Sequence, residues 1–338
     1  MRTLLSAAAV TLAAAGFAGA AAHAESGPPP WAYGFDTPVP NPPPPTARPT
    51  PAAPLDNTVQ HTLPGTDRTF TRTQISNRYG PADWYPGDHP AMPEIVARGR
   101  ETATPTVYAC ALCHLPNGKG RPENANVTGL SYEYIMQQLS DFRAGNRVSS
   151  DPRKPNTQLM MQFAQQMTEE ETRAAAKYFA AIPASPWIKV VESETVPRTH
   201  AVGGVFLPLT GEDAGTEPIG ARIVETPVNV EDTEVRRNPR SGFLAYVPPG
   251  SVRKGETLVT AGGGRTTACT VCHGSDLRGL GPVPPLAGRS PSYIGRQLYD
   301  MQHGNRTGTW TPLMAPVVSR LSEEDILDAA AYLASLTP

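Results

Sequence analysis

Two copies of one five-residue pattern constrain this chain more than any other feature. CALCH occupies residues 110–114 and CTVCH occupies residues 269–273, and together they contain all four cysteines of the 338 residues. In each copy, two thiols three positions apart are followed at once by a histidine. Any fold proposed for the chain must therefore explain both the cysteine content and the duplication.

The duplication extends well beyond the two pentapeptides. Residues 134–147 and 293–306 are identical at eight of 14 positions, with the same offset of 159 that separates the pentapeptides. Further on, residues 159–182 match residues 313–336 at an offset of 154, so the second copy lacks five residues of the loop between. An internal repeat of this length predicts two domains of the same fold.

Each copy has the periodicity of helices. Residues 131–145 place apolar side chains at helical spacing and end at a glycine. A capping box starts the last helix of each copy, formed by Thr168 with Glu171 and by Ser322 with Asp325. The predicted fold class is therefore all-α, with two tandem domains.

A Cys-x-x-Cys-His pentapeptide has the chemistry of covalent haem attachment. The two thiols add to the vinyl groups of a haem, and the adjacent histidine supplies a neutral imidazole to the iron. A structural zinc site needs four protein ligands, and no further cysteine is present. We therefore expect two covalently bound haem c groups. The expected attachment residues are Cys110, Cys113 and His114 for the first haem, and Cys269, Cys272 and His273 for the second.

The repeat also supplies candidates for the sixth iron ligand. Met160 and Met314 are equivalent positions, 46 and 41 residues after their histidines, in a stretch expected to be irregular. A methionine opposite the histidine fills the coordination sphere of an electron-transfer haem and raises its potential. Met161 competes with Met160 in the first copy. For any single methionine, the alternative role is to fill the core.

Arg147 and Arg306 follow Gly-Asn in both copies. A fixed guanidinium can bind a haem propionate through two hydrogen bonds, so both arginines are candidate propionate contacts. The alternative is that each arginine is a solvent-exposed charge at the end of a helix.

We predict no catalytic residue.

The N-terminus has the features of an export signal. Arg2 precedes an apolar run that starts at Leu4, and the small residues of AHA predict cleavage after about Ala24. An uncleaved anchor is the alternative. With 18% charged residues, a net charge of −2 and no later membrane-spanning run, the chain should be periplasmic and soluble, without a nucleic-acid partner.

Three further segments complete the chain. Residues 27–54 contain 12 prolines, which predicts an extended tether. Trp84 and Tyr85 belong to an aromatic, turn-rich extension and are expected to pack onto the first domain. Between the copies, β-branched residues predict short strands in an irregular, partly β interdomain segment. The expected order is a signal peptide (1–24), a Pro-rich tether and extension (25–90), domain 1 (91–184), the interdomain segment (185–250) and domain 2 (251–338).

With its two pentapeptides, the Leu-Met pairs at 159–160 and 313–314 and the sequence PVPPLAG, the chain resembles class I c-type cytochromes, and more closely the dihaem c4 type. The resemblance implies cytochrome c domains, in which helices surround each haem and single electrons pass through an exposed haem edge. It also implies that a backbone carbonyl orients each ligand histidine, at Pro285 in the second domain and at Asn126 in the first.

We therefore predict a periplasmic dihaem electron carrier rather than an enzyme. Its expected donor is a quinol-oxidising complex or a periplasmic dehydrogenase, and its expected acceptor is a terminal oxidase or another redox protein. One alternative is a dihaem peroxidase or a substrate-oxidising cytochrome subunit of a larger enzyme complex. Another is a fixed subunit of a membrane assembly, with the tether as an anchor. A peroxidatic haem needs an open distal site with an acid–base residue, and the paired methionines argue against one.

Overall fold

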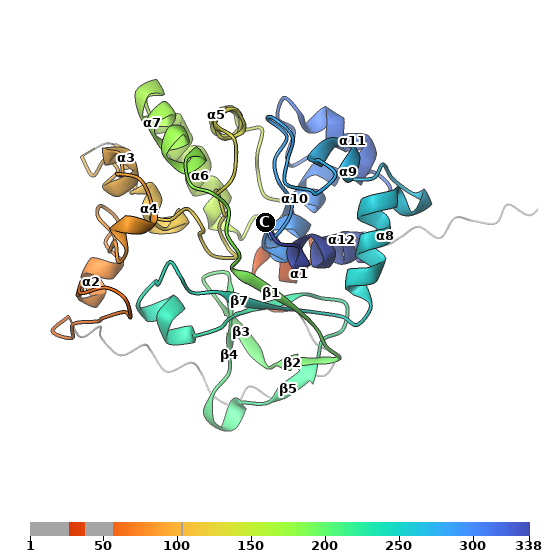
Figure 1. Cartoon of the computed structure of the whole chain (residues 1–338), viewed down its shortest axis with the longest axis horizontal. Coiled ribbons are helices and arrows are strands. Elements are labelled where there is room, and N and C mark those ends of the chain that lie inside the picture. Colours follow the sequence, from red (N-terminus) through yellow and green to blue (C-terminus); the bar gives the residue numbers. More distant parts are fainter. Residues whose placement is uncertain (1–26, 38–56, 103) are drawn as a thin grey trace, which may run out of the picture.

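The computed structural model describes residues 27–37, 57–102 and 104–338. Two helical domains lie side by side, and a layer that contains the strands lies beneath them (Figure 1). The predicted signal peptide and most of the Pro-rich tether fall outside the described residues. Within the described ranges, no helix has the length and apolarity needed to span a membrane.

Domain 1 encloses its core between three long helices and two short ones. Helix α5 packs against both α6 and α7, and Ile135, Phe163 and Phe179 meet in the core between them. Thr168 and Glu171 form the predicted capping box at the start of α7. The helices are α3 (Glu94–Ala97), α4 (Cys110–His114), α5 (Tyr132–Arg143), α6 (Pro155–Gln166) and α7 (Glu169–Ala180).

Domain 2 repeats this arrangement and adds a long first helix. Helices α8 and α12 pack closely because Gly255 has no side chain: a Cβ there would lie 1.9 Å from the Asp328 carbonyl oxygen. Ser322 and Asp325 form the second predicted capping box. The helices are α8 (Ser251–Ala261), η4 (Gly262–Gly264), α9 (Thr270–His273), α10 (Pro291–Gln302), α11 (Thr311–Val318) and α12 (Glu323–Ser335).

The interdomain segment folds into a small β layer. A three-stranded sheet has the order β1-β7-β6, with β1 parallel and β6 antiparallel to β7, while β2 pairs with β5 and β3 with β4. Strands β1 and β6 lie in the two stretches whose β-branched residues predict strands. The elements are β1 (Ile188–Glu192), β2 (Thr195–Pro197), β3 (Thr199–Val202), β4 (Val205–Pro208), η2 (Gly211–Asp213), β5 (Thr216–Pro218), β6 (Val224–Pro227), η3 (Glu231–Val235) and β7 (Phe243–Val247).

The β layer is joined to domain 2 through the start of α10. Glu225 on β6 is 1% exposed, and its Oε2 accepts hydrogen bonds from the Ser290 hydroxyl (2.8 Å) and the Ser292 backbone N–H (3.1 Å). Burial raises the pKa of Glu225. Ile223 and Val247 extend the core of domain 2 into the layer. The segment is therefore a structural element and not a loose connection between domains.

The structure corrects the predicted tether at its first residues. Pro30–Tyr33 form the short helix α1, and Trp31 and Tyr33 are buried in the core of domain 2. The Tyr33 hydroxyl donates a hydrogen bond of 2.7 Å to Asp300. Two aromatic side chains between prolines bury enough apolar surface to dock this stretch, which proline content alone does not reveal.

The aromatic extension, residues 57–90, also differs from expectation. It contains α2 (Arg72–Ile75) and η1 (Pro86–Asp88), and Trp84 and Tyr85 lie in a small core of its own. The Trp84 indole N–H donates to the Arg236 carbonyl oxygen at 2.8 Å. The two predicted aromatics therefore contact the interdomain segment, because a buried indole N–H needs a carbonyl partner and that segment supplies it.

Candidate haem-binding sites

Each helical domain contains an apolar cavity behind its pentapeptide. The cavity of domain 2 has a volume of about 400 Å³ and that of domain 1 about 170 Å³. Each is lined by the predicted cysteines, histidine and methionine of its own domain. These residues are Cys110, Cys113, His114 and Met160 in domain 1, and Cys269, Cys272, His273 and Met314 in domain 2.

Both histidines are oriented by a backbone carbonyl. Nδ1 of His114 lies 2.9 Å from the Ala125 oxygen, and Nδ1 of His273 lies 2.7 Å from the Pro284 oxygen. Since a carbonyl only accepts, Nδ1 carries the proton in each ring and Nε2 is left free to bind iron.

These carbonyls lie one residue before the positions that the resemblance implied, Asn126 and Pro285. In domain 1 the Asn126 carbonyl oxygen instead accepts a hydrogen bond of 2.7 Å from Arg289 of domain 2. The preceding carbonyl, that of Ala125, is the one directed at the ligand histidine.

Burial sets the protonation of the attachment residues. It lowers the pKa of His114 and of His273, which favours the neutral imidazole that binds a metal. It raises the pKa of Cys110 to about 12 and that of Cys269 to about 11. None of the four thiols is in a disulfide.

No cluster of three or more His, Cys, Asp or Glu side chains suited to a metal ion occurs in the described ranges, which leaves the zinc alternative without a ligand set.

The candidate methionines lie on helices, not in irregular backbone. Met160 is in α6 and Met314 in α11, and each of these helices has a proline in its first two positions, where proline favours helix formation. Met160 lines the cavity of domain 1, whereas Met161 is not among its lining residues. The structure therefore favours Met160 over its neighbour as the residue that faces His114.

Arg147 and Arg306 meet across the boundary between the domains, where they form an isolated antiparallel bridge. Arg147 is 9% exposed, so it is not the solvated charge of the alternative interpretation. Both guanidiniums donate to the side-chain oxygens of Gln138 and Gln297, at 2.7–3.0 Å. Burial lowers the pKa of Arg147. A buried and a half-buried guanidinium, both hydrogen-bonded to neutral side chains and each lining the cavity of its own domain, fit the carboxylates of a haem.

The two cavities share a wall. Gln138 and Gln297 line both, as do Leu130, Tyr134 and Tyr293. Each cavity is thus apolar around its pentapeptide and polar where it approaches the other domain. This distribution fits a flat apolar ring that has acidic substituents on one edge.

Two buried arginines that connect the domains were not among the predicted site residues. Arg289 donates to the carbonyls of Asn126 and Thr128, each at 2.7 Å, and Arg296 donates to the Pro122 carbonyl at 3.2 Å. Both arginines are 4% exposed. Neither has an arginine at the equivalent position of the first copy, so the repeat gave no signal for them.

The chain belongs to the cytochrome c family. The family model for cytochrome c matches residues 96–182 and 252–337, which together make up about half of the chain and place one family domain on each pentapeptide. It is a dihaem class I cytochrome of the c4-like kind, and its cofactors are two covalently bound haem c groups.

Named relatives match the chain over different lengths. The "Thiosulfate dehydrogenase electron acceptor" of Stutzerimonas stutzeri (strain A1501) is 25% identical over 237 residues, which cover 69% of this chain and 82% of that protein. Cytochrome c4 of Pseudomonas aeruginosa is 37% identical over 76 residues, covering 22% of this chain and 36% of that protein. The crystal structure of reduced recombinant cytochrome c4 from Pseudomonas stutzeri superposes with a TM-score of 0.43 at 20% identity, covering 67% of this chain and 93% of that chain.

Proposed function

We propose that this protein is a periplasmic dihaem electron carrier whose irons each have one histidine and one methionine ligand. The pairs are His114 with Met160 and His273 with Met314. The observation that carries the proposal is the placement of each pair on one cavity, together with the wall that the two cavities share. Thioethers to the haems form at Cys110, Cys113, Cys269 and Cys272.

The haem, when bound, supplies the one-electron redox couple, and the chain supplies its environment. Ala125 and Pro284 hold the histidine rings so that Nε2 faces the cavity. Met160 and Met314 would supply the second protein ligand to each iron and so leave no open site for a substrate. This arrangement supports a carrier over a peroxidase.

The polar ends of the cavities are where we place the propionates. Arg147 and Arg306, bridged by Gln138 and Gln297, offer donors to both domains at the shared wall. Pairing with carboxylates offsets the cost of burying two guanidiniums close together. With haems bound, the same donors would hold the propionates of both cofactors at the shared wall, which would favour electron exchange between the domains.

For the donor we favour a periplasmic dehydrogenase over a quinol-oxidising complex, because the relative matched over the greater part of the chain is named an electron acceptor of thiosulfate dehydrogenase. The acceptor is a terminal oxidase or another redox protein. The same likeness keeps open a role as the cytochrome subunit of such a dehydrogenase. The export signal predicted at the N-terminus supports the periplasm as the location.

The ligand assignment is tested by Met160→Ala and Met314→Ala in the holoprotein. Each substitution should abolish the ferric methionine–iron charge-transfer band of one haem. It should also lower the potential of that haem by on the order of 100 mV, a fraction of the ~0.8 V range that axial ligands control. Optical redox titration and electron paramagnetic resonance (EPR) measure both effects, with Met161→Ala as the control. Spectra unchanged by either substitution would show that other residues bind the iron.

A further inference from the structure

The mouth of the cavity in domain 2 is open and apolar. Val271, Leu280 and Leu313 are 67%, 64% and 76% exposed, and Cys272 is also exposed. Cys272, Leu280 and Leu313 also line the cavity, so they surround its opening. We call these four residues the apolar rim. None of the four carries a charged side chain.

The equivalent positions of domain 1 are less exposed. The repeat places Leu112, Cys113, Arg121 and Leu159 where the rim residues stand, and none of them is exposed. At the position of the exposed Leu280, domain 1 has the charged Arg121. The loop that follows the pentapeptide is likewise less exposed in domain 1 than in domain 2. Asn117 and Glu123 are 6% and 4% exposed, whereas their counterparts Asp276 and Pro282 are exposed.

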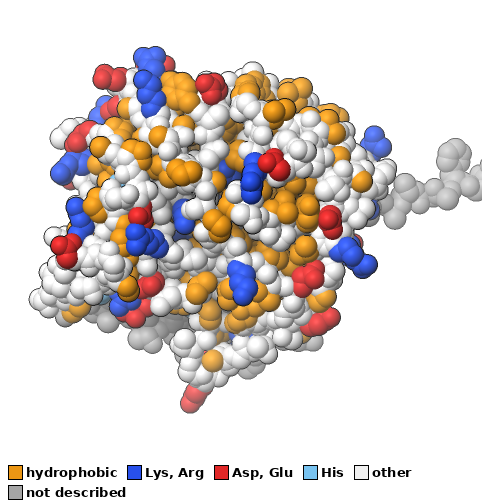
Figure 2. Space-filling model, in the orientation of Figure 1, with side chains coloured by type: hydrophobic (Ala, Val, Ile, Leu, Met, Phe, Trp, Pro, Cys, Tyr) orange, Lys and Arg blue, Asp and Glu red, His pale blue; other side chains and the backbone are white. Residues whose placement is uncertain are grey.

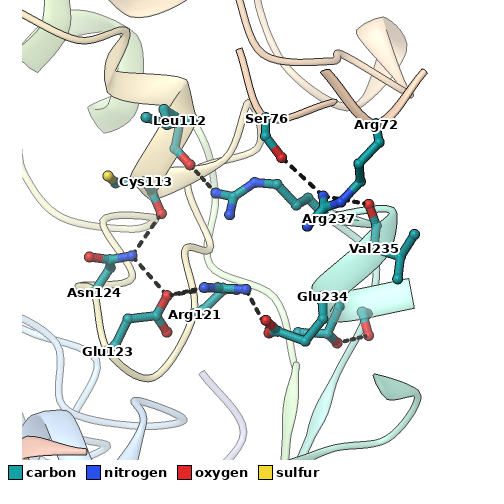
Figure 3. Close-up of polar contacts among 12 residues, drawn as sticks. Arg72, Ser76, Leu112, Cys113, Arg121, Glu123, Asn124, Glu234, Val235 and Arg237 are labelled. Atoms are coloured by element: carbon teal, nitrogen blue, oxygen red, sulfur yellow. Dashed lines mark hydrogen bonds and ion pairs between the residues drawn. The ribbon is translucent and has the colours of Figure 1, made fainter. Parts of the chain in front are cut away.

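Charged residues of the interdomain segment cover domain 1. Figure 3 shows Arg121 between two carboxylates, with Nη1 2.8 Å from Glu234 and Nη2 2.7 Å from Glu123. Arg237 donates a hydrogen bond to the carbonyl of Leu112, inside the CALCH pentapeptide. We call Glu234, Arg237 and the backbone between them the roof of domain 1.

The extension 57–90 supports the roof from outside. The Arg72 guanidinium donates to the Val235 carbonyl at 2.8 Å, and the Trp84 indole donates to the Arg236 carbonyl at 2.8 Å (Figure 3 shows the first contact). The roof therefore lies against the CALCH pentapeptide of domain 1, and the extension packs on the roof.

Two asparagine side chains form a hydrogen-bonded bridge between elements of domain 1. Asn124 donates to the Cys113 carbonyl at 3.3 Å and accepts a hydrogen bond of 2.7 Å from Asn156 on α6. These contacts connect the pentapeptide to the helix that carries Met160. The equivalent residues of domain 2 are Val283 and Trp310, which cannot form an amide–amide bridge.

We propose that the protein exchanges electrons with its partners through the apolar rim of domain 2 alone, and that the roof restricts domain 1 to exchange with domain 2 across the shared wall. This inference rests on the proposed carrier function. One electron leaves the reduced partner and reduces domain 2. Domain 1 is then reduced as domain 2 returns to its oxidised state, and the protein gains a second electron in the next encounter.

The partner that fits the rim is a soluble redox protein with an uncharged, apolar docking face. The rim is neutral, and Asp276 and Arg278 in the adjoining loop have opposite charges. On the face shown in Figure 2, basic and acidic side chains are scattered singly among hydrophobic ones, without a large patch of one sign. Four side chains supply far less than the ~1,200–2,000 Å² of a stable interface, so the contact suits a transient redox encounter.

The test uses the oxidised holoprotein and a reduced blue-copper protein with an apolar docking face as the probe. Leu280→Glu should slow the reduction of both haems at least tenfold, because a buried carboxylate penalises docking. Val228→Glu is the matched control, since Val228 is 63% exposed and lies in the interdomain segment. Rapid freezing followed by EPR distinguishes the two haems. Reduction of domain 1 at the wild-type rate in Leu280→Glu would overturn the proposal.

Two further measurements separate this inference from the carrier function. Hydroxyl-radical footprinting should show that the probe protects Leu280 and Leu313 and leaves Leu112 unaffected; protection at Leu112 would contradict it. Combining Leu280→Glu with Arg237→Ala should open a direct route to domain 1 and restore its fast reduction, with domain 2 then reduced through domain 1. A stable dimer that Leu280→Glu dissociates would show instead that the rim binds a second copy. The methionine–iron spectra of these variants report on the carrier function independently.

Discussion

His89 shows how a single side chain fastens the extension to domain 1. Its side chain is 4% exposed, its Nε2 lies 3.2 Å from Asp83 and its ring packs against Tyr178. Burial alone would lower the pKa of His89, but the hydrogen bond to Asp83 and the contact of Nδ1 with the Pro90 carbonyl outweigh it and raise the pKa above 6.5. The folded state therefore favours the charged imidazolium more than the unfolded chain does.

This shift predicts that the extension is held more weakly at alkaline pH. The stabilisation is fully present below the unfolded pKa of 6.5 and is lost as the pH rises through the higher folded value. Limited proteolysis of the holoprotein should cleave within residues 57–90 faster at pH 8.5 than at pH 6. His89→Gln should remove this dependence. Equal cleavage rates of the wild-type protein at both pH values would contradict the assignment.

At the scale of elements, the crossing of α8 and α12 depends on one missing side chain. Gly255 lies at the point where the helices touch, and the nearest atom to an added Cβ is a backbone oxygen, which cannot rotate away. The α12 residues at this contact are Asp328, which is 5% exposed, and Tyr332, whose Cβ would lie 2.8 Å from the added Cβ. The helix pair therefore has little room to adjust.

Gly255→Ala should destabilise domain 2 by about 1–3 kcal/mol, the usual cost of overpacking, because α8 and α12 must separate. Thr257→Ala, at an exposed position of the same helix, is the control and should change the free energy of unfolding by less than about 0.5 kcal/mol. Denaturant titration followed by the absorbance of the haem measures both. Equal stabilities of the two variants would show that the crossing is not a tight contact.

For the whole molecule, α1 joins parts that are far apart in sequence. Trp31 packs against Gly295 on α10, while the carbonyl of Ala32 accepts from Arg296 of domain 2 and that of Tyr33 accepts from Lys154 of domain 1 at 3.3 Å. In Figure 1 this helix, in red, lies beneath the boundary of the two domains. The N-terminal segment thus acts as a clamp between them.

Trp31→Ala should cost about 3–5 kcal/mol, as for other buried tryptophans, and loosen the coupling between the domains. Calorimetry of the holoprotein should then show the unfolding of the two domains as separated transitions. Val59→Ala, at a position that is 44% exposed in the extension, is the control. A single transition at an unchanged temperature would show that α1 is dispensable.

Local patterns were sufficient to predict the helical units. The capping boxes at Thr168 and Ser322 depend on residues three positions apart, so their chemistry is visible in the sequence. The repeat paired Met160 with Met314, and the structure places both on the cavities of their histidines. Covalent haem attachment follows from the pentapeptides for the same reason, since its reacting groups are adjacent in the chain.

Two copies of one helical unit, each with a covalent haem, can be predicted from the amino-acid sequence alone, because that information is local and occurs twice. The inequality of the two copies, in contrast, arises only when the chain folds. The roof on domain 1 depends on Arg121 meeting Glu234 and on Arg237 reaching Leu112, contacts between residues more than 100 positions apart. Such pairs leave no periodicity or spacing to read, because burial and charge pairing across distant segments exist only after the chain has folded.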